Sequence, residues 1–228
     1  MRHARATILP AALAALLATM SPGCGPFISW TVAQFAPPQK VKALYRPPAG
    51  KSILVFVDDP RLIIDHEPVK SKLTALLNER LERNEVTGKT IPYANLVNLM
   101  AATPQFNMLS ISEVGTKLQA DLVLYVKVDK FSVMNEEINP LWQGTFQTTV
   151  RIVESGTGDC LWPAAPEAGH TLPILKTAPT EGKSATHAMQ LANELAERMA
   201  DQIARLFFDY KVEVSDAPRD KAAPIDLD

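Results

Sequence analysis

The acidic pair Asp58–Asp59 is the first feature of the sequence that could do chemistry. It ends the stretch SILVFVDDPRL, whose apolar part runs from Ile53 to Val57. β-branched and aromatic residues in so short a run predict a buried strand. Carboxylates at the end of a strand can hold a divalent cation or exchange protons with a substrate. The pair therefore raises the question of phosphate or metal chemistry.

Two segments resemble strands of two-component receiver domains, in which acidic residues hold magnesium beside an aspartate that takes up phosphate. One is the run ending in Asp58–Asp59, and the other is DLVLYVKVDKF, which begins at Asp121. Aligning the second segment on the receiver pattern places Val126 at the phosphate acceptor, and a valine can neither be phosphorylated nor bind magnesium. Residues 60–68 also separate the acidic pair from the next helix, whereas a receiver enters that helix directly. We therefore expect the pair to be a polar strand end and a turn starter, with a metal role as the alternative.

No other pattern in the sequence predicts catalysis, a metal ion or a cofactor. Glycine-rich phosphate loops and the Gly-x-Ser-x-Gly elbow are missing. Glu136–Glu137 is typical of a solvated turn. Trp142 and Trp162 are expected to cover the sheet, with sugar stacking as the alternative. The four histidines show no metal-ligand spacing: His3, His66, His170 and His187. We predict a protein that is not an enzyme, with no catalytic residues.

Composition and charge narrow the class of protein further. The chain has 228 residues, of which 46% are hydrophobic and 21% are charged, which is enough apolar material for a core. The net charge of −2 and the pI of about 6.1 do not predict a nucleic-acid partner. No apolar run reaches the roughly 18 residues of a membrane-spanning helix.

The amino terminus has the layout of a secretory signal. Arg2 and Arg5 precede an uncharged, Ala- and Leu-rich stretch from Ala6 to Met20, which leads to Ser21-Pro22-Gly23-Cys24. A cysteine after a small residue resembles the lipobox of bacterial lipoproteins, which implies cleavage and lipid on Cys24. Ser21 stands where leucine is usual, so a signal cut elsewhere and an uncleaved anchor are the alternatives. Gly25 implies the outer membrane by the enterobacterial sorting rule.

The two cysteines of the chain bear on this prediction. If Cys24 carries lipid, Cys160 is left alone in an oxidising compartment. Its apolar context, CLWP, predicts an inert buried thiol. A disulfide between the two is the competing outcome, and it would exclude lipid on Cys24.

Four segments are expected along the chain: a signal peptide (1–23), a proline-rich tether (24–50), one α/β domain (51–210) and a disordered acidic tail (211–228). Within the domain we expect a helix from Pro68 that closes before Gly88, helical turns over 94–102 and a loop over 163–183. Strands are predicted at 122–133, 145–153 and 160–162, and one long helix at 184–210. Ser110 and Glu113 predict a capping box ahead of a helix over 111–119.

The segment SEVGTKLQADLVLYVKV, Ser112 to Val128, contains Glu-x-Gly-x-x-x-x-Ala-Asp-x-Val-Leu. This pattern resembles a group of envelope domains: the curli-secretion lipoprotein, the lipoprotein activator of a penicillin-binding protein, and the amino-terminal domain of TolB. The resemblance implies an anticodon-binding-like two-layer sandwich, a mixed sheet packed by helices that include a long carboxy-terminal one. Gly115 would let its helix approach the sheet closely. No transmembrane hairpins of the curli channel and no propeller repeats of TolB are present, so fold and location carry over, and activity does not.

These observations predict a lipid-anchored envelope protein that acts as a non-catalytic interaction or scaffold module. Its partners would be the membrane, through lipid on Cys24, and an envelope protein or the cell wall; an oligomer is compatible with this. An accessory subunit of an envelope transport or secretion complex is one alternative. An exported enzyme that uses Asp58, Asp59 or a histidine is the other.

Overall fold

The computed structural model describes residues 39–64, 67–133, 141–165, 168–177, 180–181 and 185–212. One compact unit comprises residues 42–210, and a second unit joins residues 1–41 with 211–228. The strands β1 (Gln39–Val41) and β10 (Tyr210–Val212) pair with each other and belong to the second unit, except for Tyr210. The predicted signal peptide, residues 24–38 of the predicted tether and most of the predicted tail lie outside the described residues, as do Cys24 and Glu136–Glu137.

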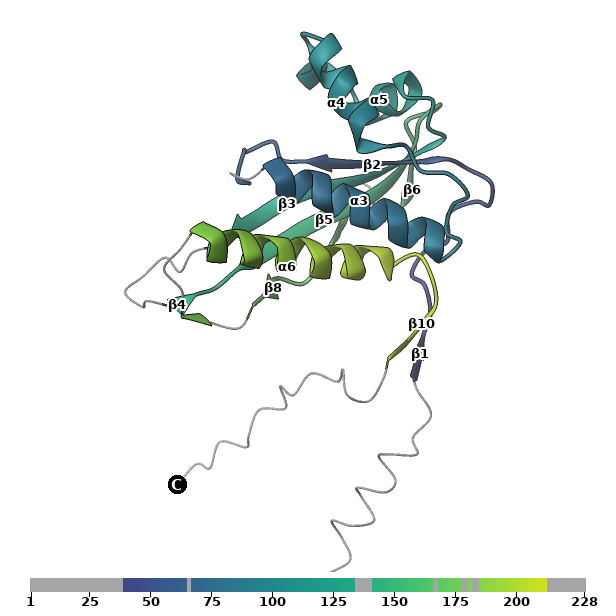
Figure 1. Cartoon of the computed structure of the whole chain (residues 1–228). Helices are drawn as coiled ribbons and strands as arrows, with labels where there is room; N and C mark the ends of the chain where they lie inside the picture. Colours follow the sequence, from purple (N-terminus) through teal and green to yellow (C-terminus); the bar gives the residue numbers. More distant parts are fainter. Residues whose placement is uncertain are drawn as a thin grey trace, which may run out of the picture. The chain divides into compact units, whose positions relative to one another are not determined.

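A mixed sheet forms the centre of the 42–210 unit (Figure 1). Its strand order is β2 (Ile53–Asp58), β3 (Leu122–Ser132), β5 (Thr145–Glu154) and β6 (Cys160–Trp162). β2 and β3 run parallel, whereas β3 is antiparallel to β5 and β5 to β6. Consecutive residues of β2 and of the first half of β3 are buried, so both faces of these two strands are covered, although β2 is the first strand of the order.

Residues 163–183, predicted as a loop, contain three short strands instead. β7 (His170–Thr171) and β8 (Leu175–Lys176) pair with β5, and β9 (Thr180–Glu181) pairs with β4 (Leu141–Trp142). A strand of two residues is too short to show alternating apolar and polar residues in the sequence. Its position depends on pairing with the neighbouring strand instead. The predicted loop was therefore wrong in this region.

Two long helices cover one face of the sheet, α3 (Glu67–Arg83) and α6 (Ala185–Ala204). The main core lies between them and the strands. Its largest fully buried members come from both layers: Ile53, Leu73, Leu77, Leu81, Leu122, Leu124, Phe146, Ile152, Leu195 and Met199. This confirms the predicted α/β sandwich with a mixed sheet and a carboxy-terminal helix.

The carboxy-terminal helix ends earlier than predicted. It stops at Ala204 rather than at Tyr210, and the chain tightens through N–H bonds from Leu206 to the Ile203 carbonyl and from Phe207 to the Ala204 carbonyl. Leu206 and Phe207 are both buried, so the turn brings two neighbouring apolar side chains into the core. A continued helix would separate them by about 100° around its axis.

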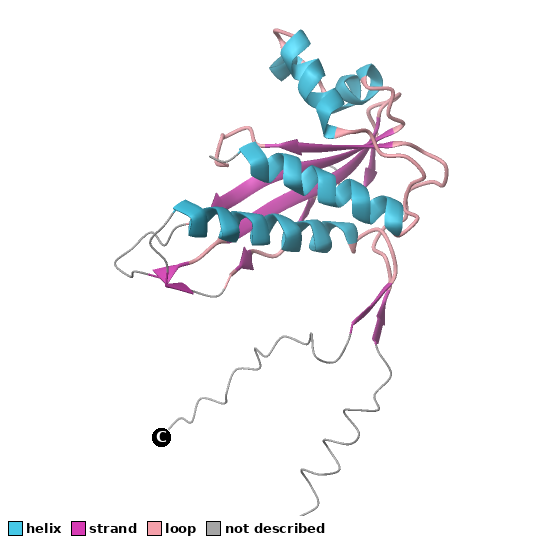
Figure 2. Ribbon diagram, viewed as in Figure 1, coloured by secondary structure: helices cyan, strands magenta, loops and turns pink. Residues whose placement is uncertain are grey.

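A smaller helical layer lies on the other face of the sheet (Figure 2). It consists of α4 (Tyr93–Ala102), the 3₁₀ turn η1 (Phe106–Met108) and α5 (Ile111–Lys117). Leu96 and Val114 pack against Leu54 and Val123 of the sheet. The helical turns predicted over 94–102 are confirmed, and the extra layer was not foreseen.

The chain enters and leaves the compact unit at one corner. The Ala43 N–H donates to Asp209 Oδ1 at 2.9 Å, and the Arg46 guanidinium lies 2.8 Å from the same oxygen. The N–H groups of Leu44 and Tyr45 both donate to the Leu206 carbonyl. Residues 43–46, which belong to the predicted tether, are thereby held against the segment that follows α6. Among the described residues, no helix has the length and apolarity needed to cross a bilayer.

Candidate functional site

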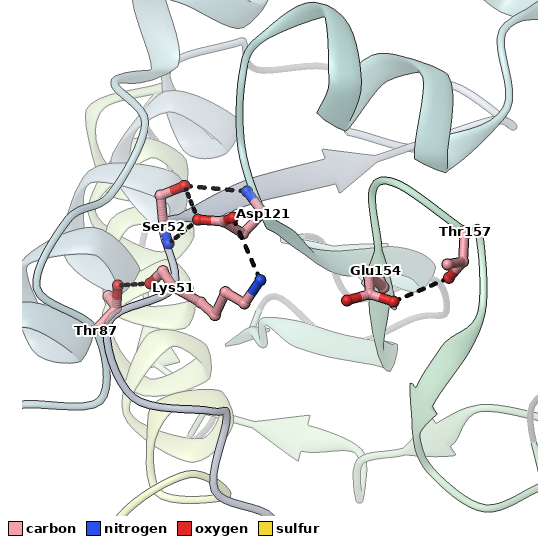
Figure 3. A network of polar contacts seen from close by, with 6 residues as sticks. All are labelled: Lys51, Ser52, Thr87, Asp121, Glu154 and Thr157. Atoms are coloured by element: carbon pink, nitrogen blue, oxygen red, sulfur yellow. Dashed lines mark hydrogen bonds and ion pairs between the residues drawn. The ribbon is translucent and has the colours of Figure 1, made fainter.

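The Ala120–Asp121 corner, part of the segment that resembles the envelope domains, is a polar clasp between two strands (Figure 3). The Ser52 N–H and hydroxyl both donate to Asp121 Oδ2 at 2.8 Å, and the Asp121 N–H donates back to Ser52 Oγ at 3.0 Å. The backbone and then the hydroxyl of Ser52 lower the pKa of Asp121 below its ordinary value of 3.8. The carboxylate therefore joins the residues that stand directly before β2 and β3.

A hollow of about 450 Å³ lies beside this clasp. Lys51 Nζ sits 3.5 Å from Asp121 Oδ1, and Thr157 Oγ1 donates to Glu154 Oε2 at 3.0 Å (Figure 3). Its lining residues come from three stretches of the chain: Lys51, Thr116, Gln119, Ala120, Asp121, Glu154, Ser155, Gly156 and Thr157. Asp121 pairs with Lys51, and Glu154 accepts a hydrogen bond from Thr157. Both acids of the hollow therefore stabilise the ends of neighbouring strands.

The capping box predicted at α5 is confirmed. The Glu113 N–H donates to Ser110 Oγ at 3.2 Å, and the Ser110 N–H donates to Glu113 Oε2 at 2.7 Å. One turn later Gly115 lies against β3 and the β5–β6 turn. A Cβ at Gly115 would lie 2.6 Å from Val123 Cγ2 and would overlap Ser155 Oγ. The close approach predicted for this glycine is therefore confirmed.

Asp59 starts a turn, as predicted. Its side chain is completely buried and accepts the Ile63 N–H at 2.9 Å and the Ile64 N–H at 2.8 Å, with Lys70 Nζ 3.8 Å away. Leu62, within this turn, has φ 51°, a left-handed conformation that costs a leucine about 1–2 kcal/mol. Both oxygens of Asp59 thus serve the turn and do not face an open site.

Asp58 belongs to a different group, on the face of the sheet that carries the smaller helical layer. It accepts the Tyr125 hydroxyl at 2.5 Å, and the Arg151 guanidinium lies 5.5 Å from the centre of the Tyr125 ring. Asp129 accepts the Thr149 hydroxyl at 2.5 Å and pairs with Lys127 at 3.0 Å. Of the residues in this group, Asp58 and no other was singled out from the sequence. The others could have been found from the register between β3 and β5, which places Tyr125 opposite Arg151 and Lys127 opposite Thr149.

The electrostatics of this group favour a protonated tyrosine. Burial, followed by the hydrogen bond to Asp58, raises the pKa of Tyr125 well above its ordinary value of 10.0. A phenol with a raised pKa donates a hydrogen bond and does not act as a base near neutral pH. Within the described residues, no three His, Cys, Asp or Glu side chains are grouped as a metal site requires.

Cys160 is a free, half-buried thiol on β6, more exposed than the buried thiol predicted from its context. Its Sγ lies 3.2 Å from the Trp162 carbonyl oxygen. It borders a second hollow, of about 460 Å³, that also has Arg151, Ser110 and Ser112 in its lining. Trp162 packs on Tyr45, His170 and Phe207, which favours its predicted covering role. His66 lies outside the described residues, as His3 does.

No family model matches the sequence, and no curated protein matches it. Among solved structures, lipoprotein GNA1162 from Neisseria meningitidis is 16% identical, covers 68% of this chain and 99% of its own, and has a TM-score of 0.38. A minor lipoprotein from Acinetobacter baumannii is 14% identical over 70% and 91% of the two chains, with a TM-score of 0.35. The PelC dodecamer from Paraburkholderia phytofirmans is 10% identical over 74% and 94%, with a TM-score of 0.38.

Two of these three structures are lipoproteins by name, and none is the curli-secretion, penicillin-binding-protein-activator or TolB protein. TM-scores below 0.5 at such low identity assign neither a family nor a function to this chain. What the protein does must therefore be inferred from its own residues.

Proposed function

We propose that this protein is a lipid-anchored module of the bacterial cell envelope that works by binding another envelope component and not by catalysis. The observation that carries the proposal is the junction Gly23-Cys24, which follows a positive n-region and an uncharged Ala- and Leu-rich stretch. Lipid on Cys24 would hold the chain at a membrane, and Gly25 favours the outer one.

The corner at which the chain enters the compact unit supports attachment of this unit to a membrane through its amino-terminal segment. Ala43 and Arg46 are both fixed to Asp209, and the Leu206 carbonyl accepts two further N–H groups from the incoming segment. These contacts hold residues 43–46, within the predicted tether, in place on the 42–210 unit. Between Cys24 and Lys42 the chain is long enough to reach about 60 Å when fully extended. The rest of the surface is then free to meet a partner.

Four carboxylates with well-defined hydrogen bonds stabilise the fold, which supports a non-catalytic role. Asp59 closes a turn, Asp121 joins two strands, Glu113 caps α5, and Asp209 holds the incoming chain. A catalytic acid or base needs an atom that can reach a substrate. Each of these four carboxylates accepts at least one backbone N–H of the same chain.

An exported enzyme is the second candidate, and the Asp58–Tyr125 contact is the observation that favours it. The two groups lie 2.5 Å apart beside Arg151, on the sheet face that carries the smaller helical layer. The raised pKa of Tyr125 weakens this candidate, since the phenol stays protonated. An accessory subunit of an envelope transport or secretion complex is a narrower form of the first proposal, and identification of the partner would separate the two.

Membrane fractionation combined with crosslinking in intact cells tests the proposal. Wild-type protein should sediment with membranes and crosslink to an envelope component, whereas Cys24→Ala should be released and lose that product. Cys160→Ala is the matched control, since it also removes a cysteine and should behave as wild type. Equal membrane attachment of Cys24→Ala and wild type would overturn the anchor. Hydrolysis or group transfer that is lost in Asp58→Ala would overturn the non-catalytic role.

A further inference from the structure

The smaller helical layer contains an unusually long segment without charge. Thr90 to Ser112 is 23 residues long and has no Asp, Glu, Lys, Arg or His. At the 21% charged residues of the whole chain, a segment of this length would carry about five. The segment comprises α4, η1 and the first residues of α5. We refer to the exposed side chains of residues 92–109 as the neutral surface.

The neutral surface is apolar as well as uncharged. Leu96 is the one buried residue of the ten in α4, so most of that helix faces away from the sheet. Val97 is 41% exposed, Met100 is 45% exposed and Met108 on η1 is 79% exposed. These are three of the six large hydrophobic side chains that the described residues expose. Figure 1 shows α4 reaching beyond β2 on the side of the sheet away from α3 and α6.

The polar side chains of the neutral surface can pair with themselves. Besides hydroxyls they are carboxamides, and four of these are exposed: Asn95, Asn98, Gln105 and Asn107. A carboxamide both donates and accepts hydrogen bonds, so two identical copies satisfy each other. A two-fold contact places the same patch on both subunits, where like charges would repel. A surface with amides and no charges avoids that cost.

We propose that the neutral surface binds a second copy of this chain, α4 against α4, in an isologous contact. Its extent approaches that of such a contact, because 17 of the 18 residues from 92 to 109 are at least partly exposed, and a standard interface uses about 20–30 residues a side. The unbranched Met100 and Met108 can adapt to a facing helix. The inference does not depend on lipid at Cys24.

A lipid surface fits the same residues less well. Helices that lie in a membrane interface carry lysine and arginine on the polar face, and this segment has none. Asn95 and Asn98 would have to leave water without a partner in the hydrocarbon, which costs several kcal/mol per amide. A second copy offers each amide a partner.

Charge substitutions at Val97 test the proposal by the mass of the full-length protein in detergent. Wild type should be a dimer or a higher assembly built from dimers. Val97→Lys and Val97→Glu should each weaken association at least about tenfold, because the contact then holds two like charges. Mixing the two variants should restore association, since opposite charges then meet. Val97 is exposed, so both variants should fold, and circular dichroism checks this.

Crosslinking in cells gives a second readout. Met100→Cys should form a disulfide-linked dimer, whereas Leu62→Cys, which is 76% exposed but lies outside the neutral surface, should not exceed the wild-type background. A monomeric wild type, equal crosslinking at both positions, or charge variants with unchanged mass would overturn the proposal. Binding of wild type but not Val97→Lys to phosphatidylethanolamine vesicles, with both proteins monomeric, would assign the surface to lipid instead.

Discussion

Ser52 and Asp121 are joined by three hydrogen bonds, although 69 residues separate them in the sequence. Both residues stand directly before a strand, and the two strands are parallel neighbours with Ile53 opposite Leu122. Parallel strands need a long crossover, so no tight turn fixes their register. The hydrogen bonds between Ser52 and Asp121 fix this register directly before the pair Ile53–Leu122. The aspartate of the Ala-Asp corner is therefore a structural residue of the sheet.

Removal of the Asp121 carboxylate should destabilise the fold moderately. Asp121→Ala loses two accepted hydrogen bonds on a half-exposed side chain, so we expect the free energy of unfolding to fall by about 1–2 kcal/mol. Urea denaturation followed by circular dichroism measures the change. Glu154→Ala, which loses a side-chain bond to Thr157 alone, is the control and should stay within about 0.5 kcal/mol. Equal stabilities of both variants and wild type would contradict a clasp.

The same clasp predicts a dependence of stability on acid. The pKa of Asp121 is lower in the folded chain than its ordinary value of 3.8, so the unfolded chain binds the proton more readily. The contribution of the clasp is fully present above that ordinary value and is lost as the pH falls through the folded pKa. The stability difference between wild type and Asp121→Ala should therefore shrink between about pH 5 and pH 2. A difference that is constant over this range would rule out the lowered pKa.

An added methyl group at Gly115 should be poorly tolerated. The new Cβ would lie 2.6 Å from Val123 Cγ2 and would overlap Ser155 Oγ. Overpacking of this kind costs about 1–3 kcal/mol, which outweighs the gain of up to about 1 kcal/mol in helix propensity. Gly156→Ala is the matched control, since nothing lies within 4 Å of its Cβ position. Thermal unfolding should show a lower midpoint for Gly115→Ala and no clear change for the control; the reverse order would refute the close approach.

The two adjacent aspartates should respond differently to mutation. Asp59→Ala leaves the Ile63 and Ile64 N–H groups without their acceptor beneath a buried turn, so we expect a loss of about 2–4 kcal/mol. Asp58→Ala removes the single bond from Tyr125 and should cost about 1 kcal/mol. Urea denaturation of both variants gives the comparison. A larger loss for Asp58→Ala would mean that the turn does not depend on Asp59.

The sequence predicted those parts of the fold that long periodic patterns determine. The α3 stripe from Val69 to Leu81, the strand at Leu122 and the capping box at Ser110 all lie where local pattern and burial agree. The end of α6 was misplaced because tertiary burial of Leu206 and Phe207 overrides helix propensity there. The partner of Asp58 was missed because Tyr125 lies 67 residues further along the chain. Contacts of this kind depend on strand register, which a single strand does not reveal.

The mass of the mature amino-terminal peptide tests the central claim most directly. Full-length protein would be expressed in a bacterium with an outer membrane, extracted from membranes, digested and analysed by mass spectrometry. For a lipid-anchored protein we expect Cys24 as the first residue and a peptide that carries the added mass of acyl chains. A peptide that still contains residues 1–23, or an unmodified Cys24, would contradict the anchor on which the proposed function depends.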